Sequence, residues 1–195
     1  MSHLDNITDL KNLSLAQNLI LKIKDVESFS KLIGLSLDYN RFAKIENIEN
    51  LKNFKNFDLK YNKISTIENL DTLHNLRSLY LDNNNISKIE NIKHFTEPRK
   101  LSLIYNTISR IIRLNILTKL EVLNLSNNRI LRIENLETIQ RLYDLYLNYN
   151  QIERIENIAP PPGFFKLELS YNRIKEVVNE TPLPIGDDLI LDHIR

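Results

Sequence analysis

The residues of this chain that could act in catalysis or bind a metal are few and widely separated. The four histidines lack the short spacing of metal ligands: His3, His74, His94 and His193. The chain contains no cysteine, which excludes a thiolate nucleophile, a disulfide framework and a metal site with cysteine ligands. Only three glycines occur, and no phosphate-binding loop, HExxH motif or GxSxG motif is present. We therefore expect a protein that is not an enzyme and that binds no metal or cofactor.

A repeat of 22 residues organises the chain instead. Asparagines fall at this interval eight times: Asn18, Asn40, Asn62, Asn84, Asn106, Asn128, Asn150 and Asn172. Each ends the phrase LxxLxLxxN and is followed, two residues later, by isoleucine or a close substitute. This period and pattern are similar to those of leucine-rich repeats. The repeat predicts one domain over residues 1–195, with about eight complete 22-residue repeats and partial repeats at both ends.

Each repeat predicts a short strand and a return segment. The LxLxx phrase alternates apolar and polar residues, as a strand with one buried face does. Stacked repeats pair these strands in parallel, and the asparagine side chain meets backbone groups at the turn that follows. The fold class predicted is therefore α/β: a right-handed leucine-rich-repeat solenoid, shaped as a curved horseshoe, with a parallel β-sheet on the concave face. Apolar residues three apart in the return segment predict 3₁₀ or short helical turns on the convex face.

Two features of the return segment allow a functional alternative. Basic residues form a file there, and glutamates form a second file two residues on: Lys22, Lys44, Lys88, Arg110, Arg132 and Arg154, against Glu46, Glu68, Glu90, Glu134 and Glu156. A phosphate-binding stripe is the alternative to simple charge compensation, and the interleaved glutamates disfavour it. The segment Pro160-Pro161-Pro162-Gly163 should bulge from the convex side, as a tolerated loop or as a site for a proline-recognising partner.

The concave face offers the strongest candidate site. Its outward-facing positions hold seven acidic and three basic residues, so this face carries a charge of about −4 while the chain carries +1. Four residues between the second and third leucines are acidic or aromatic: Asp58, Tyr80, Tyr146 and Glu168. Asp82 and Asp144 lie in the neighbouring files. An acidic surface with tyrosines favours a basic protein partner and disfavours nucleic acid.

A row of tyrosines stands immediately before the repeating asparagines. Its members are Tyr39, Tyr61, Tyr105, Tyr149 and Tyr171. Tyrosine combines a large apolar area with a polar tip and is enriched in the energetically dominant residues of interfaces. We therefore add Tyr105 and Tyr149 to the candidate partner-binding residues, although such rings can also serve only to shield the edge of the sheet.

The unit LxxLxLxxNxIxxIENLxxLxx resembles the subclass of leucine-rich repeats typified by regulatory subunit 7 of protein phosphatase 1. The segment from Leu76 to Ile92 is close to that consensus, and the likeness covers nearly the whole chain. The resemblance implies a regulatory subunit that contacts the phosphatase catalytic subunit through Asp58, Tyr80, Tyr146 and Glu168. Ser14, Ser36, Ser102 and Asn124 depart from the type of residue found there, and the C-terminal cap of that family is missing.

Two other classes of protein have repeats of this kind. The unit is similar to that of ciliary and axonemal or cytoskeletal scaffolds, and its period is that of internalin-like bacterial adhesins. The chain has no secretory signal, no apolar run of about 18 residues and no cysteine, so we expect an intracellular protein of the cytoplasm, the nucleus or both. No polar cap is evident at either end, which predicts a fragment or self-association through the open ends.

Overall fold

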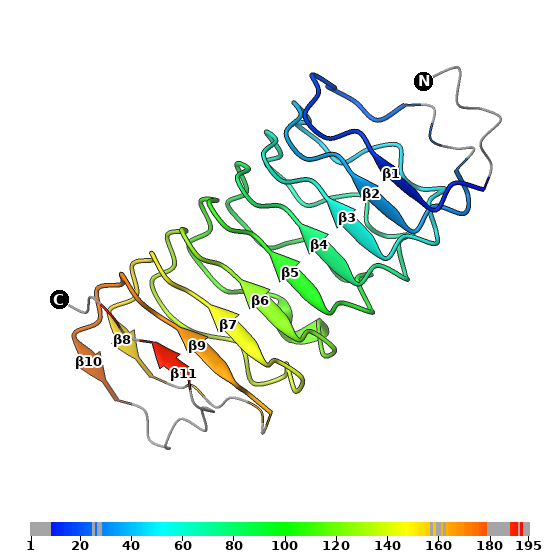
Figure 1. Ribbon diagram of the computed structural model, residues 1–195. Helices are drawn as coiled ribbons and strands as arrows, with labels where there is room; N and C mark the ends of the chain where they lie inside the picture. Colours follow the sequence, from blue (N-terminus) through cyan, green and yellow to red (C-terminus); the bar gives the residue numbers. More distant parts are fainter. Residues whose placement is uncertain are drawn as a thin grey trace.

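A computed structural model describes residues 9–24, 26, 29–156, 158, 161, 163–178, 188–190 and 192. These residues form a solenoid whose strands lie side by side along one face (Figure 1). The nine strands of this parallel sheet are β1 (Asn12–Ser14), β2 (Gly34–Ser36), β3 (Asn56–Asp58), β4 (Ser78–Tyr80), β5 (Lys100–Ser102), β6 (Val122–Asn124), β7 (Asp144–Tyr146), β9 (Lys166–Glu168) and β11 (Asp188–Ile190). The predicted parallel solenoid is confirmed.

The 22-residue period sets the register of the sheet. Every strand pairs with the same position of the next repeat, so that Leu13 pairs with Leu35, Leu35 with Phe57 and Phe57 with Leu79. In this sheet the central residue of every strand from β2 to β7, and of β9, is buried. The residues on either side of it are exposed to different degrees. The leucines and isoleucines of successive repeats thus form one continuous core inside the coil.

The repeating asparagines join each repeat to the one before it. Asn62 donates from Nδ2 to the carbonyls of Leu59 and Lys60 in its own turn and to Leu37 in the preceding repeat, at 3.0–3.1 Å. Its Oδ1 accepts from the backbone N–H of Phe42 at 2.9 Å. The same bonds recur for Asn40, Asn84, Asn106, Asn128 and Asn150. The asparagines are therefore structural, as the sequence predicted.

The return side is made of turns more than of helix. Backbone bonds that span three residues recur from repeat to repeat, such as Leu51 N–H to Ile48 O and Leu73 N–H to Leu70 O, both 3.0 Å. Among the described residues, only Leu114–Ile116 forms a 3₁₀ helix, η1. Two short strands, β8 (Arg154–Ile155) and β10 (Glu176–Val177), pair in a second sheet that the sequence did not predict. About a dozen residues per repeat cross this side, which leaves no room for a longer helix.

A second file of asparagines, here called the back asparagines, also supports the return side: Asn47, Asn69, Asn91 and Asn135. Each adopts a left-handed backbone conformation, with φ between 56° and 61°. Each side chain donates to an isoleucine carbonyl of the preceding repeat, at 2.6–2.9 Å. Asparagine tolerates this conformation better than most residues, which explains the recurring Ile-Glu-Asn phrase. Of the predicted bulge at 160–163, Pro160 and Pro162 lie outside the described residues, whereas Pro161 is buried and Gly163 is exposed.

Candidate concave-face binding site

The sheet carries the predicted candidate residues to one face of the solenoid. Its register aligns the central file of that face in order from β1 to β11: Ser14, Ser36, Asp58, Tyr80, Ser102, Asn124, Tyr146, Glu168 and Ile190. Asp58 lies beside Tyr80, and Tyr146 lies beside Glu168. Strands β5 and β6, with the smaller Ser102 and Asn124, separate these two pairs. The face therefore has two clusters of acid and aromatic side chains rather than one continuous stripe.

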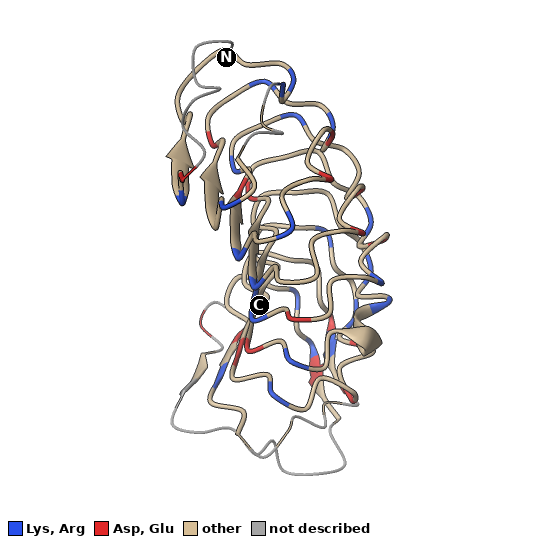
Figure 2. Ribbon diagram, turned by 90° about the vertical axis from the view of Figure 1, so that its right-hand side faces the viewer, with Lys and Arg blue, Asp and Glu red and all other residues tan. Residues whose placement is uncertain are grey.

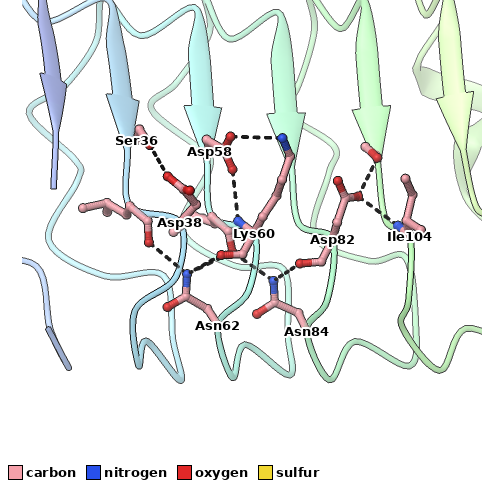
Figure 3. Close-up of polar contacts among 11 residues, drawn as sticks. Ser36, Asp38, Asp58, Lys60, Asn62, Asp82, Asn84 and Ile104 are labelled. Atoms are coloured by element: carbon pink, nitrogen blue, oxygen red, sulfur yellow. Dashed lines mark hydrogen bonds and ion pairs between the residues drawn. The ribbon is translucent and has the colours of Figure 1, made fainter. Parts of the chain in front are cut away.

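The N-terminal cluster consists of Asp58, Lys60, Tyr80 and Asp82, of which Figure 3 shows Asp58, Lys60 and Asp82. The Lys60 ammonium lies 3.2 Å from Asp58 Oδ2 and 4.6 Å from the centre of the Tyr80 ring. Burial acts to lower the pKa of Lys60, but the Asp58 and Asp82 carboxylates outweigh it and raise the pKa. Lys60 thus stays charged and neutralises part of the acidity that the sequence assigned to this end of the face.

Asp82 differs from the other acidic candidates because it is buried, with 6% of its surface exposed. Its Oδ1 accepts from the Ser102 hydroxyl at 2.5 Å and from the Ile104 N–H at 2.9 Å, both in the following repeat (Figure 3). Burial raises the pKa of Asp82, and the hydrogen bonds from Ser102 and Ile104 oppose this only in part. Asp82 therefore links two strands in addition to adding charge to the face.

The C-terminal cluster consists of Tyr146, Lys166 and Glu168. Lys166 Nζ lies 5.6 Å from the centre of the Tyr146 ring, and the Ser170 hydroxyl donates to Glu168 Oε1 at 2.5 Å. A hollow of about 570 Å³ opens over this cluster, bounded by Tyr146, Glu168 and the tyrosine row. Asp144 is the first residue of β7, two residues before Tyr146. This arrangement can bind a protruding apolar or cationic group from a partner.

A second hollow, of about 400 Å³, lies at the other end of the face. Its floor consists of small side chains, among them Ser14, Gly34 and Ser36, and Asp58 and Tyr80 close it on one side. Each cluster therefore borders its own depression in the sheet.

The tyrosine row (Tyr39, Tyr61, Tyr105, Tyr149 and Tyr171) follows the edge of the same face. All five residues adopt a left-handed conformation, with φ between 51° and 57°, as do Gln17, Asn83 and Asn127 at the equivalent positions. Tyr39 stacks on Tyr61 with ring centres 4.0 Å apart, and Tyr149 stacks on Tyr171 at 4.2 Å. Tyr105 lies between Asn83 and Asn127 and is the most exposed of the five, at 57%.

The stacking changes the chemistry of the phenols. Hydrogen bonding with Tyr61 and burial raise the pKa of Tyr39, and burial together with the Tyr171 contact raises that of Tyr149. These rings are therefore neutral at physiological pH and act as apolar surface with polar tips.

Two exposed aromatic residues on the opposite edge were missed by sequence reasoning. Tyr143 and Phe165 are about half exposed, at 50% and 49%, and they precede β7 and β9. Their signal was present in the repeat, because no earlier repeat has an aromatic residue at this position: the equivalents are Lys11, Ile33, Lys55, Arg77, Arg99 and Glu121. The C-terminal half of the face thus has aromatic residues on both edges.

The return side binds its charges internally. Arg110 contacts Glu134 at 3.3 Å, Lys22 contacts Glu46 at 3.8 Å, and Arg154 contacts Glu156 and Glu176 at 3.5 and 3.2 Å. Basic and acidic segments alternate there (Figure 2). Within the described ranges, no group of three acidic or histidine side chains could hold a metal ion. No helix of the described residues is long and apolar enough to cross a membrane.

Comparisons with known proteins agree with this architecture. Residues 52–97 and 118–160 match the family model for leucine-rich repeats, described as two copies. A comparison with curated protein sequences gives no match. Internalin C2 of Listeria monocytogenes superposes with a TM-score of 0.80 at 22% identity, over 97% of this chain and 83% of that protein.

Two further solved structures have the same fold. The internalin InlF of Listeria monocytogenes gives a TM-score of 0.72 at 23% identity, over 93% of this chain and 67% of that one. The leucine-rich-repeat domain of APL1B gives 0.78 at 21% identity, over 97% and 56%. At identities this low, the structural likeness shows a shared fold alone. The family model does not distinguish the phosphatase-regulator subclass. The repeats within residues 52–97 and 118–160 are therefore leucine-rich repeats, and the described residues have the parallel solenoid fold seen in leucine-rich-repeat structures.

Proposed function

We propose that this protein is a scaffold that binds another protein on its concave face and has no enzymatic activity of its own. The observation that supports this best is the pairing of an acidic and an aromatic residue on adjacent strands, at two places on one rigid sheet. One pair is Asp58 with Tyr80, and the other is Tyr146 with Glu168. The two tyrosines lie three strands apart, which is about 14 Å at the usual strand spacing. A partner that contacts both clusters spans a surface of the size that specific complexes bury.

The partner proposed is basic where it meets the sheet. Carboxylates outnumber cations on this face, although Lys60 neutralises Asp58 in part. Rings beside carboxylates suit arginine or lysine side chains, because the cation can contact the ring face and the acid together. The full set of proposed partner-binding residues is Asp58, Tyr80, Asp82, Tyr105, Asp144, Tyr146, Tyr149 and Glu168.

The specific partner proposed is the catalytic subunit of type-1 serine/threonine protein phosphatase. The repeat consensus and the types of residue at Asp58, Tyr80, Tyr146 and Glu168 support this choice. The structural likeness to internalins is a likeness of fold at low identity, so it does not favour an adhesin.

Calorimetric titration with the purified phosphatase catalytic subunit tests this assignment. We expect saturable binding that weakens about a hundredfold or more when Tyr80, Tyr146 and Glu168 are together changed to alanine, because central aromatic residues dominate interfaces. A matched variant changes Lys44, Lys88 and Arg132 on the return side to alanine and should bind as the unmodified protein does. Absence of binding by the unmodified protein would reject the phosphatase as partner.

A further inference from the structure

The tyrosine row contains two gaps, each one ring wide. Stacked rings in adjacent repeats lie 4.0 and 4.2 Å apart. Asn83 stands between Tyr61 and Tyr105, and Asn127 stands between Tyr105 and Tyr149. Twice the stacking distance is about 8 Å, which leaves space for one planar group in contact with a ring on each side. We call these two gaps the rim slots.

The ring faces that border the rim slots do not stack on other rings of the described residues. Tyr105 makes no ring contact with any described residue, and its exposure of 57% exceeds the 42–47% of the four stacked tyrosines. Tyr61 and Tyr149 each use one face for stacking within a pair, Tyr61 with Tyr39 and Tyr149 with Tyr171. Asn83 and Asn127 have the same left-handed backbone as the tyrosines, with φ of 55° and 56°. They therefore occupy positions of the tyrosine row without supplying a ring, and an amide there can hydrogen-bond the edge of a planar guest.

A file of cations runs beside the tyrosine row, two residues further along each repeat. Its charged members, the rim cations, are Arg41, Lys63, Arg129 and Arg173. The positions between them in the file hold uncharged residues: Asn85, Thr107 and Gln151. All four rim cations are exposed, and none forms an ion pair with a described residue. Lys63 comes two residues after Tyr61, which borders the first slot. Arg129 comes two residues after Asn127, which stands in the second slot. Each slot thus combines stacking surface, an amide and a nearby cation.

The acidity of the concave face is weak at the first rim slot and stronger at the second. The concave positions bordering the first slot are Lys60, Asp82 and Ile104. Of these only Asp82 is acidic, and its carboxylate is buried and bound to Ser102 and Ile104. Ser126 and Asn148 border the second slot, but Glu168 lines the same hollow as Asn127 and Tyr149. The surroundings of the first slot therefore favour a neutral or anionic guest over a guanidinium group.

The stacking direction limits the kind of polymer that fits. Rings in the row stack along the line of repeats, so a guest polymer on this edge must present planar groups across its own axis. A polysaccharide does not, because the planes of its sugar rings run along the chain. A single-stranded nucleic acid does, and it adds a phosphate to each planar base. Aromatic stacking beside a line of cations is the general mode by which proteins bind single strands.

We propose that the rim slots bind single-stranded nucleic acid, with one base between Tyr61 and Tyr105, another between Tyr105 and Tyr149, and the phosphates along the rim cations. This activity goes beyond the proposed binding of a protein on the concave face, and Tyr105 and Tyr149 belong to both sets of residues. Base stacking gives affinity with little sequence preference, and Asn83 and Asn127 add hydrogen bonds to the base edges.

Fluorescence anisotropy with the full chain and a labelled single strand of about ten nucleotides, oligouridine or oligoadenosine, tests this proposal. Tyr105→Ala removes the wall shared by both slots and should raise the Kd about tenfold or more. Tyr105→Phe keeps the ring and should bind as the unmodified chain does. Tyr143→Ala is the matched control, since Tyr143 is similarly exposed on the opposite edge.

A second variant separates the slots from simple charge attraction. Asn127→Tyr should fold, because tyrosine occupies the same backbone conformation at five equivalent positions. It fills one slot while keeping every cation, so binding should weaken by a similar factor without loss of thermal stability. The proposal is overturned if the unmodified chain binds no single strand, or if both Tyr105→Ala and Asn127→Tyr bind as it does. It is also overturned if an acidic peptide with two aromatic residues binds at the slots and the oligonucleotides do not.

Discussion

At the scale of single residues, the fold depends on asparagine side chains that act as extra backbone. Asn84 donates to the carbonyls of Leu59, Leu81 and Asp82 and accepts from the N–H of Ile64. Asn18, the first of the file, is exposed, and among the described residues its side chain bonds only within its own turn, to Leu15 and Ala16. Residues with the same role in the sequence pattern thus differ in the number of repeats that they join.

Asn84→Ala should therefore destabilise the protein by about 3 kcal/mol or more, because several buried backbone groups lose their partner. Asn18→Ala should cost about 1 kcal/mol or less, since water can satisfy its exposed carbonyls. Urea denaturation of both variants measures the free energies of unfolding. Equal losses for the two substitutions would show that the contact between repeats is not the source of the stability.

Asp82 provides a test of pH dependence. Its pKa is raised in the folded protein, so the folded state binds a proton more tightly than the unfolded state. The stability from this group is complete below the unfolded pKa and is lost as pH rises from that value through the folded pKa. Asp82→Asn keeps an oxygen that can accept from Ser102 and Ile104 but removes the charge. The variant should have the higher free energy of unfolding at pH 7, and the difference should shrink as pH falls below about 4. A difference that grows on acidification would contradict this sign.

At the scale of elements, the file of back asparagines is interrupted at a described position of the return side. Arg113 stands where the back asparagines occur in other repeats, and it keeps their left-handed conformation, with φ of 60°. Arginine cannot provide the amide bond to the isoleucine carbonyl one repeat earlier that Asn91 and Asn135 make. The position also borders a hollow of about 500 Å³ on this side of the solenoid.

Arg113→Asn should stabilise the protein by about 0.5–1 kcal/mol, through the preference of asparagine for this conformation and the added hydrogen bond. Asn91→Arg is the reciprocal control and should destabilise by a similar amount or more. Thermal unfolding of the two variants compares the effects. A lower melting temperature for Arg113→Asn would mean that the arginine makes a compensating contact in this hollow.

The sheet, its register and the asparagine bonds could be predicted because each depends on the position of a residue within the repeat. The strands β8 and β10 could not, since two short strands pair there only when neighbouring return segments happen to align. Side-chain partners were also beyond sequence reasoning. Lys60 neutralises Asp58 through an ion pair, and Asp82 accepts a hydrogen bond from Ser102. Both contacts depend on the side-chain rotamers. The rim slots follow from asparagines that interrupt a row of tyrosines, a pattern whose meaning depends on the stacking distance.

At the scale of the whole molecule, the repeat separates surfaces of different character. The concave face carries paired acids and rings, one edge carries the tyrosine row with unpaired cations, and the return side largely compensates its charges within itself. A solenoid keeps such surfaces apart because each position of the repeat always faces the same way. One rigid body can therefore present two chemically distinct binding surfaces.

The measurement that tests the central claim most directly is affinity capture from a eukaryotic lysate, read by mass spectrometry, with three matched baits. These are the unmodified chain, the Tyr80→Ala, Tyr146→Ala, Glu168→Ala variant, and the Lys44→Ala, Lys88→Ala, Arg132→Ala variant of the return side. Circular dichroism first establishes that all three baits are folded. We predict a protein partner that is captured by the unmodified and return-side baits and is lost with the concave-face variant. A partner lost with the return-side variant and retained by the concave-face variant would contradict the account.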